Sequence, residues 1–139
     1  MVAICVRTLG QKPVECNARA LLFKAGDALE RAAWIECGCQ LREAIRLWLY
    51  AECQYFDCLP KEKPNYQTPP RVLAKALRRG GEMSRDHYDW VVEAIDYGNK
   101  AAHLAYVRPS LLECCITLMH SFLDGSPYLV QPAAAGRLS

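Results

Sequence analysis

The sequence predicts an all-α fold, an antiparallel bundle of about five helices, and three observations support this prediction. Apolar residues recur at the three- and four-residue spacing of a helix along most of the chain. Proline and glycine clusters divide the rest into segments of helix length. The 139 residues, 52% hydrophobic and 23% charged, suffice for one core. We expect the helical domain at 17–124, an N-terminal arm or short strand at 1–16 and an extended tail at 125–139.

The first segment predicts a helical hairpin. Asn17 is a suitable N-cap, and no proline occurs from there to about Tyr55. A single helix of this length would be long for a small domain, so we expect two antiparallel helices with a turn near Glu30 to Trp34. No glycine or proline marks that turn.

A loop and a short helix follow. The stretch from Asp57 to Pro70 contains four prolines, which deny the backbone its helical donor. Proline is tolerated in the first turn of a helix, so a helix is predicted from Pro70 to Arg79. Gly80-Gly81 then ends it.

Two further helices complete the bundle. Ser84 caps a helix whose apolar stripe continues to Tyr106, and the last helix runs from about Leu111 to Asp124. Two β-like segments, 2–6 and 128–130, can pair as a short two-stranded ladder joining the termini, or form ordered arms or frayed ends. The three tryptophans are expected in the core: Trp34, Trp48 and Trp90.

Several functional classes receive no support from the sequence. No apolar run is long enough for a membrane span, and no export signal is recognisable, so we expect a cytoplasmic protein that does not associate with membranes. The eight cysteines are then expected to be thiols. Neither Cys37-Gly38-Cys39 nor Cys114-Cys115 has the spacing of a zinc site, and no phosphate-binding glycine loop is present. We expect no metal and no cofactor.

Charge is unevenly distributed. The net charge is only +2, but residues 61–85 carry seven basic and two acidic residues, a balance of +5, whereas 86–113 carry two basic and five acidic residues, a balance of −3. These can be two solvated helix faces that attract each other. Alternatively, the first is a patch for an anionic partner. The candidate residues of that patch are Lys75, Arg78, Arg79 and Arg85.

Two short motifs resemble a known family. The first is Gly98-Asn99-Lys100-Ala101-Ala102-His103, and the second is the stretch 39–45, with Arg42 at its centre. They are similar to the GN-x-x-x-H signature and the arginine-bearing second helix of an uncharacterised branch of the HEPN (higher eukaryotes and prokaryotes nucleotide-binding) superfamily. The resemblance covers roughly residues 17–123.

The resemblance implies an antiparallel helical bundle that dimerises. Many HEPN proteins are metal-independent ribonucleases with an Arg-polar-x-x-x-His motif, in which histidine moves a proton and arginine stabilises phosphoryl charge. The candidate catalytic residues are therefore His103 and Asn99, with Arg42 as the substitute cation, because Gly98 stands at the arginine position of the motif.

A structural role is the alternative for the same residues. Gly98 would allow a close helix approach, and half-buried Asn99 and His103 would satisfy polar groups of a neighbouring helix. Two functions stay open: a non-catalytic HEPN-like homodimer that binds a protein partner, and a ribonuclease or RNA-binding protein with a rearranged site. We expect a homodimer in either case, partly because several large aromatic residues compete for one small core.

Overall fold

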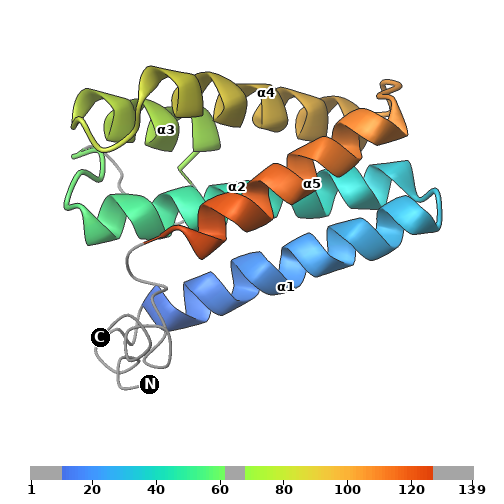
Figure 1. Cartoon of the computed structure of the whole chain (residues 1–139), viewed down its shortest axis with the longest axis horizontal. Helices are drawn as coiled ribbons and strands as arrows, with labels where there is room; N and C mark the ends of the chain where they lie inside the picture. Colours follow the sequence, from blue (N-terminus) through green and yellow to red (C-terminus); the bar gives the residue numbers. More distant parts are fainter. Residues whose placement is uncertain (1–10, 62–67, 127–139) are drawn as a thin grey trace.

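The computed structural model describes residues 11–61 and 68–126, and these form an all-α bundle (Figure 1). The predicted fold class is confirmed. The two β-like segments, 2–6 and 128–130, lie outside the described residues. The helices are α1 (Gln11–Glu30), α2 (Trp34–Tyr55), α3 (Pro70–Arg79), α4 (Arg85–Ala102) and α5 (Pro109–Asp124).

Helix α2 is the centre of the bundle, since it packs against each of the other four helices. Helices α1 and α2 form the predicted hairpin, while α4 and α5 run antiparallel to each other across α2 (Figure 1). The largest fully buried side chains come from all five helices, which together enclose one core: Leu22, Leu41, Ile45, Leu49, Leu73, Leu77, Ile95, Leu112, Met119 and Leu123.

Four helices end in the same backbone motif, in which one residue adopts left-handed φ and two amides bond back into the last turn. At the end of α1 this residue is Ala32, with φ 59°, and the Ala33 amide donates to the Ala28 carbonyl at 2.8 Å. Leu104, Asp57 and Gly81 have the same role after α4, α2 and α3. The turn predicted near residues 30–34 is therefore confirmed.

Two predicted helix limits differ from the structure. Helix α1 begins at Gln11 rather than at Asn17. Helix α4 ends at Ala102, whereas its apolar spacing continues to Tyr106 in the sequence. The left-handed turn at Leu104 redirects the chain, so Tyr106 is 77% exposed instead of extending the buried stripe.

Helices α2 and α4 cross closely at two glycines. A Cβ atom on Gly38 would lie 2.5 Å from the backbone nitrogen of Ala102 and 2.7 Å from the carbonyl oxygen of Gly98. On Gly98 it would meet nothing nearer than 3.5 Å, which is an ordinary contact. Gly98 does face the neighbouring helix as predicted, but Gly38 is the residue that the crossing requires.

Only one of the three tryptophans is part of the core. Trp48 is 5% exposed and stacks on Phe122 with ring centroids 5.4 Å apart. Its indole nitrogen donates to the Ser126 hydroxyl at 3.0 Å, and that hydroxyl lies 2.7 Å from the carboxylate of the buried Glu52. The prediction was wrong for Trp34 and Trp90, which are 38% and 46% exposed.

Candidate functional site

Two of the three candidate catalytic residues contact each other where α2 crosses α4. Arg42 follows Gly38 by one turn of α2, and Asn99 follows Gly98 directly on α4. The close crossing brings both half-buried side chains together, and Arg42 Nη1 donates to Asn99 Oδ1 at 3.4 Å. The contact is long for a hydrogen bond and so is readily exchanged for another partner.

His103 occupies a different environment from the predicted one. It is the C-cap residue of α4, and its backbone amide bonds back to the carbonyl of Asn99. Its side chain is exposed, and its imidazole makes no hydrogen bond or ion pair with residues 17–61 and 68–126. The expected half-buried imidazole that satisfies a neighbouring helix was therefore wrong, because α4 ends before the histidine.

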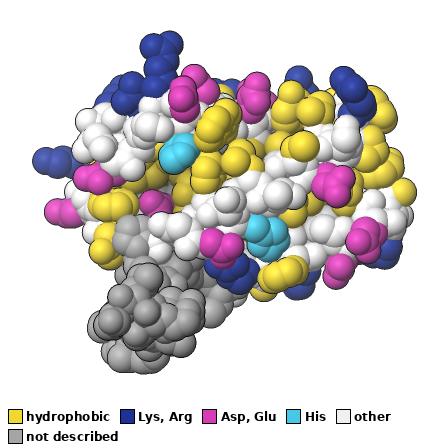
Figure 2. Space-filling model, in the orientation of Figure 1, with side chains coloured by type: hydrophobic (Ala, Val, Ile, Leu, Met, Phe, Trp, Pro, Cys, Tyr) yellow, Lys and Arg dark blue, Asp and Glu magenta, His cyan; other side chains and the backbone are white. Residues whose placement is uncertain are grey.

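The four candidate binding residues do come together. Lys75, Arg78 and Arg79 on α3 and Arg85 at the start of α4 line one groove of about 360 Å³, with Tyr88 and Asp89; we call it the basic groove. Figure 2 shows Lys and Arg side chains gathered at the end of the molecule where α3 lies. None of the four cations forms an ion pair with any described residue. Arg78 and Arg79 also complement the dipole at the end of α3.

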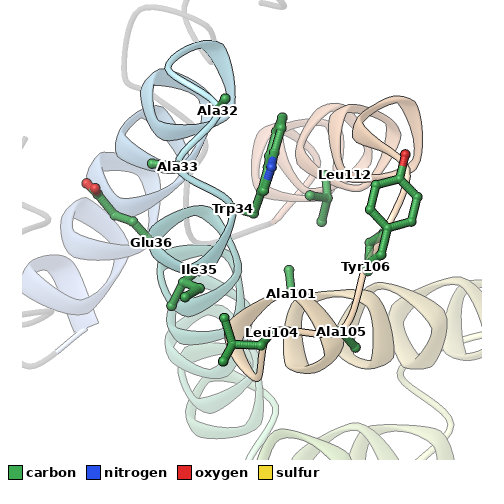
Figure 3. A pocket seen from close by; sticks show the side chains of 11 residues that line it. Ala32, Ala33, Trp34, Ile35, Glu36, Ala101, Leu104, Ala105, Tyr106 and Leu112 are labelled. Atoms are coloured by element: carbon green, nitrogen blue, oxygen red, sulfur yellow. The ribbon is translucent and has the colours of Figure 1, made fainter.

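A second surface, which the sequence did not predict, lies at the opposite end of α4. An apolar hollow of about 660 Å³ opens between the α1–α2 turn and the α4–α5 connection; we call it the end pocket. Trp34 and Tyr106 stand on opposite sides of it, with Ala101 and Leu112 between them (Figure 3). Its lining is Ala32, Ala33, Trp34, Ile35, Glu36, Ala101, Leu104, Ala105, Tyr106, Val107 and Leu112.

The end pocket has an unusually apolar rim for a surface. Ile35 and Leu104 are 46% and 79% exposed, beside the exposed rings of Trp34 and Tyr106. Monomeric proteins seldom gather large apolar side chains in one exposed patch. The only sequence signal for this surface was the excess of aromatic residues over core positions, which indicates that some are exposed but not where.

The cysteines show no arrangement for catalysis or metal binding. Six cysteines, all from Cys37 onward, are free thiols, and burial raises the pKa of Cys37 to about 11 and that of Cys115 to about 12. A thiol with such a raised pKa is a poor nucleophile near neutral pH. In the part of the chain that the structure describes, no three His, Cys, Asp or Glu side chains are grouped to hold a metal ion.

The described residues thus form a helical bundle that carries a basic groove near one end of α4 and an apolar end pocket near the other. Comparison with family models, curated proteins and solved structures finds no significant match. No helix within the described ranges is both long and apolar enough to cross a membrane.

Proposed function

We propose that this protein is a HEPN-like, non-catalytic interaction module that works in the cytoplasm as a homodimer, with the end pocket as its dimer interface. The observation that carries the proposal is the cluster of four large, exposed apolar side chains around that pocket: Trp34, Ile35, Leu104 and Tyr106. Aromatic residues that fill a partner's apolar pocket are the usual anchors of protein interfaces.

A second copy of the chain is the partner that fits the pocket best. The end pocket presents both a hollow and the protruding side chains of Leu104 and Tyr106 on one small surface. In a twofold dimer each copy offers the same patch to the other, so protrusions of one copy can enter the hollow of its partner. Glu36 is the one charged residue in the lining, and Arg31 already pairs with it at 3.1 Å, which lowers the repulsion between copies.

The candidate catalytic residues support the non-catalytic part of the proposal. Gly98 stands where the HEPN nuclease motif has arginine, and it lies buried in the α2–α4 crossing. Arg42 supplies a guanidinium nearby, but its contact is with Asn99, and His103 is exposed to solvent at the helix end.

The test of the dimer is its mass in solution. Analytical ultracentrifugation at micromolar concentration should give twice the chain mass of 15.6 kDa for the wild-type protein. Leu104→Glu places a charge at the interface and should shift the protein to monomer, weakening association by about tenfold or more, since an unpaired charge there must be desolvated.

Val72→Glu on α3 is the matched control, because Val72 is also an exposed aliphatic residue (42% exposed) but lies outside the end pocket. It should leave the dimer intact. A wild-type monomer at these concentrations, or equal loss of the dimer in both variants, would contradict the proposal.

A second candidate function is recognition of RNA, and the basic groove is the observation that favours it. Four cations without ion pairs among the described residues meet beside the half-buried ring of Tyr88. Cations that follow a phosphate backbone, next to an aromatic ring that stacks on a base, are typical of single-strand binding surfaces. The opposing interpretation is a solvated face whose arginines stabilise the end of α3.

A salt titration of RNA binding separates these interpretations. An Arg78→Glu/Arg79→Glu variant should bind a single-stranded oligonucleotide at least about tenfold more weakly, and the slope of log K against log salt should fall by about 0.7 for each phosphate that is no longer neutralised. Lys24→Glu/Arg108→Glu is the control, since it changes the net charge equally at exposed positions outside the groove. Equal weakening in both variants would indicate net charge alone and refute a specific groove.

A further inference from the structure

Five of the twelve residues that line the pocket between the N-terminal part of α4 and the C-terminal part of α5 carry aromatic rings, and we call it the aromatic pocket. It has a volume of about 530 Å³. Figure 2 shows hydrophobic side chains along this seam between the two helices. Its lining is Trp48, Glu52, Phe56, Glu82, Met83, His87, Trp90, Leu118, Ser121, Phe122, Gly125 and Ser126.

The rings form a continuous wall. Phe122 stacks on Trp48 at 5.4 Å and contacts His87 at 5.2 Å, and His87 in turn lies 5.4 Å from Trp90. Trp48 is buried and forms the inner part, while the exposed ring of Trp90 stands at the outside. Ring faces carry partial negative charge, so a wall of this kind attracts cations.

The formal charges of the lining residues are also negative. Its two carboxylates are Glu52, only 7% exposed, and Glu82, which is exposed, and no lysine or arginine of the described residues lines the pocket. Ser126 holds Glu52 in place, since its hydroxyl lies 2.7 Å from Glu52 Oε2. The nearest basic cluster, including Arg85, lines the basic groove on the other side of α4. The exposed carboxylate of Glu82 is therefore the negative charge that the lining offers to a ligand.

We propose that the aromatic pocket binds an organic cation, an alkylammonium group on a short aliphatic stem. The ammonium methyl or methylene groups lie against the rings of Trp90, His87 and Phe122, while the exposed carboxylate of Glu82 balances the charge. Leu118 and Met83 offer apolar contact to the stem. The proposal is independent of the dimer, because none of these residues belongs to the end pocket.

Ligand-observed NMR with choline tests the charge requirement directly. Choline should bind saturably at millimolar concentration or tighter, and its neutral isostere 3,3-dimethylbutan-1-ol should bind about tenfold more weakly. A short glycine-flanked trimethyl-lysine peptide distinguishes the source of the cation. Tighter binding of the peptide than of choline indicates a protein side chain, and the reverse order indicates a small free amine. Equal binding of choline and the isostere would overturn the proposal.

Variants identify the pocket. Trp90→Ala and Glu82→Gln change exposed side chains and should each weaken choline binding by about five- to tenfold with an unchanged denaturation midpoint. The controls are Trp34→Ala and Glu36→Gln, the same changes in the end pocket, and these should leave choline binding unchanged. If the pocket variants bind choline as well as the controls do, or if the wild-type protein shows no saturable binding, the proposal is wrong.

Discussion

Gly38→Ala should destabilise the protein by about 3 kcal/mol or more, the upper range for overpacking a close contact. The added methyl group would lie 2.5 Å from the Ala102 nitrogen and 2.7 Å from the Gly98 oxygen. Both are backbone atoms of α4, so no side-chain rotation can relieve the overlap. The two central helices would have to separate, and the core between them would lose packing. Urea denaturation followed by circular dichroism measures the loss.

Two other glycines provide the controls. A methyl group on Gly26 of α1 would have no atom within 4 Å, so Gly26→Ala should stabilise the protein by up to about 1 kcal/mol through helix propensity. Gly98→Ala meets only ordinary contacts at 3.5 Å and should change stability far less than Gly38→Ala. A Gly38→Ala midpoint equal to that of the wild-type protein would show that α2 and α4 do not cross as closely as described.

Trp48→Ala should cost about 3–5 kcal/mol, as expected for removing a large buried aromatic side chain. The variant loses the stacking on Phe122, and it removes the indole donor of the Ser126 hydroxyl. Ser126 follows α5, so the loss also loosens the end of α5 from α2. Denaturant unfolding at low protein concentration is the suitable measurement, because self-association adds to apparent stability.

Trp34→Ala makes the same chemical change at an exposed position and should cost less than about 1 kcal/mol under those conditions. The comparison separates a core tryptophan from a surface one. Equal losses in the two variants would mean that Trp34 is buried as deeply as Trp48, contrary to its 38% exposure.

The sequence predicted those parts of the fold that local chemistry determines. Pro70 starts α3 and Gly80-Gly81 follow its end, while the Ser84 hydroxyl accepts from the His87 amide at 3.1 Å and so caps α4. The basic groove was also predictable, because its residues are close together in the sequence: only one short turn separates α3 from the start of α4.

Features that depend on tertiary structure were not predictable in this way. By apolar periodicity Tyr106 belongs to the same helix face as the buried Val91. Tyr106 is exposed because the left-handed turn at Leu104 redirects the chain before it. Gly38 lies between two cysteines without the spacing of a zinc site, and nothing in that local stretch indicates that α4 crosses there. Arg42 was predicted as the substitute cation of the motif, and α2 does pack against α4, but the contact of Arg42 with Asn99 was not predicted.

The left-handed residues differ in how well their side chains suit that conformation. Gly81 and Asp57 adopt it readily, but Ala32 and Leu104 do so at a cost of roughly 1–2 kcal/mol each. Both strained residues line the end pocket. Backbone strain persists where the surrounding structure enforces it, and it tends to concentrate at functional surfaces. The strained backbone of Ala32 and Leu104 therefore lies at the end of the bundle where large apolar side chains are most exposed. A Leu104→Gly change would relax the turn but leave that surface without its most exposed large hydrophobic side chain.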